Sequence, residues 1–178
     1  MPTFINGIPL HALAVHAVVV LVPIAVLGGI VVSLWSAARR RYGWLLVAEA
    51  ALAAISIPIA TSSGEGLEHR LPRSTLIQTH THLGDELLIF VVPMVLLMAA
   101  FVLLHHRNET PARREGPGTT TAPPQLTGSM RMFAAGLAGL IIAFAVVSAV
   151  QVYRIGDSGA RAAWSDKQYN STSQDGAG

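Results

Sequence analysis

The sequence contains no cysteine and few charged residues. The absence of cysteine excludes disulfides, thiolate metal sites and the covalent attachment of c-type haem. Only 12% of the 178 residues are charged, about half of the roughly 25% that soluble domains carry. The formal net charge is +2, and the chain has neither a phosphate-binding glycine loop nor a basic stripe interleaved with aromatic residues. The sequence therefore favours a membrane protein over a soluble domain, and it predicts no nucleic-acid partner.

Long apolar runs are what the sequence does have, with 52% hydrophobic residues. A membrane-spanning helix needs about 20 mostly apolar residues, and four segments qualify. We expect an all-α fold, a four-helix transmembrane bundle within residues 1–165, and we find no internal repeat in the sequence. The predicted spans cover residues of about 9–35, 44–60, 80–104 and 132–152. The glycines predicted to be helix-packing contacts are Gly28, Gly29, Gly136 and Gly139.

Two segments have the composition of unstructured chain. Residues 108–129 are rich in Pro, Gly and Thr and predict a flexible cytoplasmic linker between the third and fourth spans. Residues 166–178 predict a disordered tail.

The arginines and lysines predict how the bundle is oriented. Seven of the twelve lie on the side of the loops after the first and third spans, and five lie on the other side. Positively charged loops stay in the cytoplasm. We therefore expect both termini on the extracytoplasmic side of a multi-pass protein in the plasma (inner) membrane, surrounded by the lipid bilayer. The seven are Arg39, Arg40, Arg41, Arg107, Arg113, Arg114 and Arg131.

Most ionisable residues of interest lie near the predicted outer surface. An ionisable side chain inside a bilayer is costly and usually faces the bundle interior, where it marks a functional site. His11 and His16 lie in the first span and His80 at the start of the third. The others at this end include Glu65, His82, Asp85, Glu86, Arg154 and Asp157.

Several of these residues belong to motifs that resemble one family. The segment from Leu10 to Val18 resembles a pattern Leu-His-Pro-x-x-Val-His-Phe-Pro, and it keeps both histidines and the valine but neither proline nor the phenylalanine. Further similar segments are residues 39–44, 63–71, 79–87 and 153–164. With these motifs the chain resembles the domain-of-unknown-function 2231 family of integral membrane proteins, in its actinobacterial form.

The resemblance implies a membrane protein but no established activity. Some members of the family look to be joined to Rieske or cytochrome c domains, which implies membrane electron transfer with a respiratory or other membrane-protein partner. Members often have a histidine at the position of Asp157, so this chain departs from them there.

The leading hypothesis for the site is a b-type haem near the outer face. Neutral imidazole suits haem iron, and a bis-histidine haem takes one ligand from each of two facing helices. We predict His16 and His80 as the facing pair, with His11 as the substitute for His16. Gly84 lies one turn from His80 and leaves room for a flat group.

Charged residues complete this hypothesis. Arg154 is predicted to offset a propionate charge, and Asp85 and Glu65 to accept hydrogen bonds from the ligand imidazoles. A copper or zinc ion at the same site is the alternative to haem. Its candidate ligands are His16, His80, His82, Asp85 and Glu86.

Two other functions stay open. In a non-catalytic membrane subunit or interaction protein, the histidines and carboxylates would form a hydrogen-bond network that fixes helix register. Metal or proton transport would need a polar path across the bilayer, and Glu49 is the only acidic residue near the inner half. Ser62 and Ser63 form no recognisable nucleophile motif with the histidines, which favours a protein without enzymatic activity.

Overall fold

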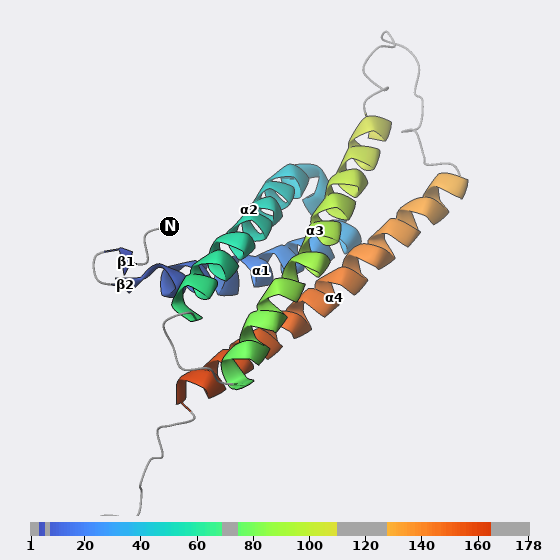
Figure 1. The fold of residues 1–178 in the computed structure, drawn as a ribbon. Helices are drawn as coiled ribbons and strands as arrows, with labels where there is room; N and C mark the ends of the chain where they lie inside the picture. The colour runs from blue at the N-terminus through green and yellow to red at the C-terminus, as the bar shows by residue number, and fades with distance from the viewer. Residues whose placement is uncertain (1–3, 6–7, 69–74, 110–127, 165–178) are drawn as a thin grey trace, which may run out of the picture.

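Four long helices make up the protein (Figure 1). The computed structural model describes residues 4–5, 8–68, 75–109 and 128–164. The predicted all-α bundle is confirmed, with a short antiparallel pair of two-residue strands before it. Most of the predicted linker and the whole predicted tail lie outside the described residues. The elements are β1 (Phe4–Ile5), β2 (Ile8–Pro9), α1 (Leu10–Leu34), α2 (Ser36–Glu68), α3 (Thr75–Glu109) and α4 (Gly128–Trp164).

Each helix is long and apolar enough to cross a bilayer. Large aliphatic side chains cover the outside of the bundle, and more than half of the surface of several of them is exposed. A water-facing surface of this kind would be unfavourable, whereas a lipid-facing one is expected. The protein is therefore a multi-pass membrane protein whose surroundings are the lipid bilayer. Examples of these side chains are Leu27, Leu52, Leu96 and Leu140.

α1 matches the first predicted span, whereas α2, α3 and α4 extend beyond theirs. Residues 39–41, predicted to lie in a loop, belong to the first turns of α2, because only Trp35 separates α1 from α2. The segment holds no proline or glycine before Gly43, and alanine and arginine are strong helix formers. The side chain of Arg39 turns back, and its guanidinium donates to the carbonyl of Val32 at 2.7 Å. This bond satisfies one of the free carbonyls at the end of α1.

The bundle consists of two antiparallel helical hairpins, α1 with α2 and α3 with α4 (Figure 1). The hairpins meet where α2 packs against α3 and α1 against α4, so α1 and α3 are diagonal neighbours. The starts of α1 and α3 and the ends of α2 and α4 lie at the same end of the bundle, which we call the histidine end.

Two glycines of α1 let this helix approach its neighbours closely, Gly28 within the first hairpin and Gly29 against the second hairpin. A Cβ atom on Gly29 would lie 3.2 Å from Ile141 Cγ2 and 3.5 Å from Met98 Sδ, and one on Gly28 would lie 3.3 Å from Leu46 Cδ2. The predicted packing role of these two glycines is confirmed. For Gly136 and Gly139 it is wrong, since a Cβ there would meet no atom within 4 Å. The largest fully buried side chains are Val22, Val32, Ile57, Leu87, Val91, Met94, Met98 and Ile141.

Candidate functional site

His11 in the first turn of α1 is held by the last turns of α2. Its Nδ1 lies 3.0 Å from the carbonyl oxygen of Ala60 and 3.5 Å from the hydroxyl of Ser63. The imidazole lies against Gly64, where an added Cβ would be 3.0 Å from His11 Cε1. Only glycine at residue 64 allows the ring to come this close to the backbone of α2.

His80 on α3 is held by α4 in the same way. Its Nδ1 lies 3.1 Å from the carbonyl oxygen of Ile155 and 3.2 Å from the hydroxyl of Ser158. An added Cβ on Gly159 would be 3.0 Å from His80 Cε1. Each hairpin thus presents one histidine from its first helix against a serine and a glycine of its second helix.

This equivalence is an internal repeat that we did not find in the sequence. The matching parts of the hairpins are single residues within otherwise different apolar segments, so no run of similar residues marks the repeat. One signal was present: Ser-Gly occurs only at residues 63–64 and 158–159. In each case the carbonyl that accepts the imidazole hydrogen bond belongs to the residue three positions before the serine.

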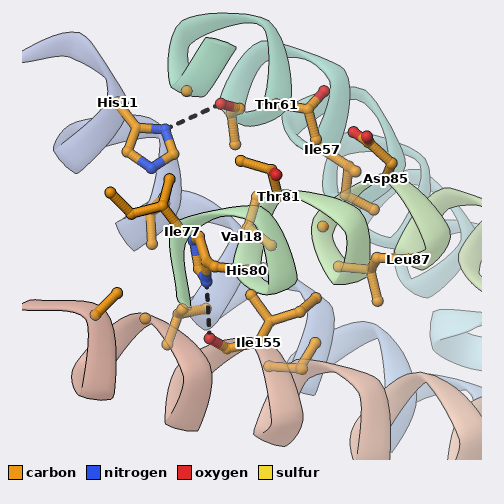
Figure 2. Close-up of a pocket in the computed structure, with 18 of the residues that line it drawn as sticks. His11, Val18, Ile57, Thr61, Ile77, His80, Thr81, Asp85, Leu87 and Ile155 are labelled. Atoms are coloured by element: carbon orange, nitrogen blue, oxygen red, sulfur yellow. Dashed lines mark hydrogen bonds between the residues drawn. The ribbon is translucent and has the colours of Figure 1, made fainter. Parts of the chain in front are cut away.

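The hydrogen bonds determine which nitrogen of each ring is available. A carbonyl oxygen can only accept, so Nδ1 carries the proton in both rings, and Nε2 of the neutral imidazole keeps its lone pair. Among the described residues, no hydrogen-bond partner is found for either Nε2 atom. Figure 2 shows that the second nitrogen of each ring lies on the side that faces the other ring. The ring centroids of His11 and His80 are 6.5 Å apart, and the ring planes are at 88°.

A cavity of about 480 Å³ surrounds the two rings and is lined by all four helices (Figure 2). This volume lies within the roughly 300–1,000 Å³ range of cofactor and small-molecule sites. Most of the lining is aliphatic, with Thr61, Thr81, Glu65 and Asp85 as polar exceptions. Gly84 also lines it, and its nearest neighbour for an added Cβ is the methyl group of Thr61 at 3.8 Å, so the space beside it is open.

The predicted pairing of His16 with His80 is wrong. His16 is exposed on α1, and its Nδ1 lies 2.6 Å from the carbonyl oxygen of Ala12 on the preceding turn. Five residues rotate a helix by about 140°, so His11 and His16 cannot both face the bundle interior. The interior face includes His11, which the sequence predicted as the substitute for His16 in the pair.

The charged residues predicted to complete the site lie near the cavity, but they do not contact the imidazoles as predicted. Asp85 and Glu65 line the cavity, but the backbone carbonyls of α2 and α4 accept the imidazole hydrogen bonds in their place. Arg154 is exposed and does not line the cavity. Its guanidinium lies 3.5 Å from the side-chain oxygen of buried Gln151, whose amide donates to Glu86 at 3.0 Å.

The predicted metal ligands do not converge. His82 points away from the cavity, with 75% of its side chain exposed, and its Nδ1 is 3.3 Å from Glu86 one turn later. Within the part of the chain that the structure describes, no three His, Cys, Asp or Glu residues are arranged to hold a metal ion. The geometry brings together two imidazoles, from His11 and His80.

Two other acidic residues lie away from the cavity. Asp157 is next to Ser158 but pairs with Arg161 at 3.0 Å on the exposed side of α4. Both carboxylate oxygens of Glu49 in α2 are buried, with no hydrogen-bond partner among the described residues.

Comparison with known proteins gives the family and no function. No curated protein and no solved structure matches the chain. The model of one family, described as predicted membrane protein (DUF2231), matches residues 7–172. Since this match covers nearly the whole chain, the protein belongs to the DUF2231 family of predicted membrane proteins.

Proposed function

We propose that the protein is a membrane electron-transfer component that binds one b-type haem between His11 and His80. The observation that carries the proposal is the pair of imidazoles, each with Nδ1 bonded to a carbonyl and with Nε2 on the side that faces the other ring. A histidine that binds a metal through one ring nitrogen usually donates the N–H of its other ring nitrogen to a carbonyl or carboxylate, as Nδ1–H does here.

The separation of the rings supports an iron atom between them. An imidazole nitrogen binds a metal at about 2 Å, so two rings on opposite sides of one ion have centroids roughly 6.4 Å apart. The observed separation is 6.5 Å. The two histidines come from different hairpins, and the cavity beside them is lined by Gly84 and by aliphatic side chains of all four helices, which would suit the apolar faces of a haem.

A haem with two histidine ligands supplies one-electron transfer and has no open position for oxygen. His11 and His80 would hold the haem, and the protein would also supply an apolar surrounding and nearby charges. Those charges are the carboxylates of Glu65 and Asp85, which line the cavity.

The site's place in the cell follows from the predicted orientation. The histidine end is expected on the extracytoplasmic side of the plasma membrane, because the larger group of arginines is at the opposite end. Electrons would then pass to or from a respiratory or other membrane-protein partner on that side. A copper or zinc ion at the same pair of imidazoles is the alternative ligand for this site.

The visible spectrum of the full-length protein, purified from cells supplied with haem, tests the proposal. We expect the sharp bands of a six-coordinate b haem after reduction, at one haem per chain. His11→Ala and His80→Ala each remove one ligand and should abolish these bands. Matched controls are His16→Ala and His82→Ala, which remove exposed imidazoles on the same two helices and should leave the spectrum unchanged.

A wild-type protein that is colourless after haem supply would refute the haem. Metal analysis of the same sample tests the copper or zinc alternative. Haem that is lost in His16→Ala but retained in His11→Ala would contradict the assignment of the ligands.

A second proposal is a structural role for the same polar groups. It is supported by the bonds that already join the helices at this end, namely His11 to α2, His80 to α4, and Gln151 to the carbonyl of Leu83 at 3.3 Å. Such bonds stabilise helix association by about 0.6 kcal/mol on average in membranes. If this is their only role, His11→Ala lowers stability by an amount of this order in a protein that contains neither haem nor metal.

A further inference from the structure

We propose that Ser63-Gly64 and Ser158-Gly159 are two equivalent positioning pairs, which hold the imidazoles of His11 and His80 as Nδ1–H tautomers at right angles to each other. The inference deepens the proposed function, because it rests on that proposal for the iron that the two Nε2 atoms would bind. The positioning itself is a property of the protein alone and is tested separately below.

The serine of each pair supplies a second acceptor for the Nδ1–H that the carbonyl already binds, and so reinforces the tautomer. The hydroxyl of Ser63 donates to the carbonyl of Ala60 at 2.8 Å, and the hydroxyl of Ser158 donates to the carbonyl of Ile155 at 2.9 Å. The same two carbonyls accept the imidazole hydrogen bonds. Because each hydroxyl proton is already used, the serine oxygen offers lone pairs to the nearby Nδ1–H. Both serines are buried, so water does not compete for these bonds.

The glycine of each pair fixes the position of the ring. In both cases an added Cβ would lie 3.0 Å from Cε1 and 3.8 Å from Nε2 of the imidazole. The contact with Cε1 is closer than carbon atoms normally approach, so alanine would push each ring away from its helix by a few tenths of an ångström. Gly156, one turn before Gly159 on α4, has no atom within 4 Å of an added Cβ, and it is therefore a matched control.

The two pairs together set the angle between the rings, which is 88°. Axial imidazoles at right angles interact equally with two iron d orbitals, whereas parallel imidazoles separate the energies of these orbitals. Oxidised low-spin haem with perpendicular rings therefore gives a strongly anisotropic electron paramagnetic resonance signal with one dominant low-field feature. Parallel rings give a rhombic signal with three resolved features.

The first experiment uses the full-length protein with bound haem. We expect the single low-field feature in the wild type and in Gly156→Ala. Gly64→Ala and Gly159→Ala should each lose it, in favour of a rhombic signal or the high-spin signal of an iron with one histidine ligand. If both variants keep the wild-type signal at full haem content, or if the wild type is rhombic, the positioning role is refuted while the haem stands.

The second experiment needs no haem. Nitrogen-15 nuclear magnetic resonance of the haem-free protein, labelled at histidine, reports which ring nitrogen carries the proton. His11→Ala and His80→Ala assign the two signals. We expect Nδ1–H for both residues in the wild type and in Gly156→Ala, and a shift toward Nε2–H at His80 in the double variant Ser158→Ala, Gly159→Ala.

These results separate the two proposals. A colourless wild type with both histidines as Nδ1–H tautomers refutes the haem and retains the positioning. Nε2–H tautomers in the haem-free wild type refute the positioning pairs whatever the spectrum shows. An unchanged His80 tautomer in a folded double variant would also refute them.

Discussion

A valine at Gly29 should destabilise the bundle, and the surroundings of this glycine show by how much. Gly29 lies on α1 where that helix crosses α3 and α4. An added Cβ would lie 3.2 Å from Ile141 Cγ2, 3.5 Å from Met98 Sδ and 3.8 Å from Met94 Sδ. Ile141, Met94 and Met98 are completely buried, so the two further carbons of valine have no free volume to occupy.

The expected loss is about 1–3 kcal/mol in the free energy of unfolding, the usual cost of overpacking a dense core. Alanine at the same position should be nearly neutral. Its single methyl group is too close only to Ile141 Cγ2, which must move by a few tenths of an ångström. Replacing glycine in a helix contributes up to about 1 kcal/mol in the opposite direction.

Unfolding in mixed detergent micelles, followed by circular dichroism, measures this difference. Gly139→Val is the matched control, because an added Cβ at Gly139 meets no atom within 4 Å. If Gly29→Val and Gly139→Val have the same stability, α1 does not cross α3 and α4 as described.

Further predictions concern orientation and charge. A reporter that is active only outside the cytoplasm should work when fused after Gly178 and fail when inserted at Gly118, since the arginine distribution predicts that the termini are outside. The opposite result would reverse the predicted orientation. Glu49→Leu should raise the free energy of unfolding by about 1–3 kcal/mol in the same assay. The reason is that it removes a buried carboxyl that has no hydrogen-bond partner among the described residues. A loss of stability would indicate that the carboxyl has a partner. Glu65→Gln and Asp85→Asn should each raise the midpoint potential of a bound haem by an amount on the order of tens of millivolts, because a nearby negative charge favours the oxidised iron. Redox titration measures this potential. A fall in the potential would show that the carboxylate does not act through its charge.

Periodicity and hydropathy were sufficient to predict the four helices, but they could not give the rotation of α1 about its axis. Helical spacing showed that His11 and His16 point in different directions. It could not show which of them faces inward, because packing against α2 and α4 decides this. His16 is deeper in the predicted span and seemed the costlier residue to expose, yet the carbonyl of Ala12 on its own helix satisfies its Nδ1.

The partners of the histidines were harder to predict than the histidines themselves. Backbone carbonyls have no signature in the sequence, and a serine or glycine in an apolar helix is usually a packing residue. The contacts of Ser63 and Ser158 depend on which helices are neighbours, and this follows from the tertiary structure. The ends of the helices were also difficult, because α2 and α4 continue as helices past the last apolar residues of their spans.

Because His11 and His80 lie on different hairpins, their order of synthesis determines when the cavity between them can form. The first hairpin can enter the membrane with His11 already bonded to α2, but the opposite ring arrives with α3 and obtains its own support only when α4 is in place. Insertion of the last helix therefore completes the site. Any group that binds both rings must be loaded after the whole chain has been inserted, and a chain truncated before Ile155 would retain His80 without the carbonyl that orients it.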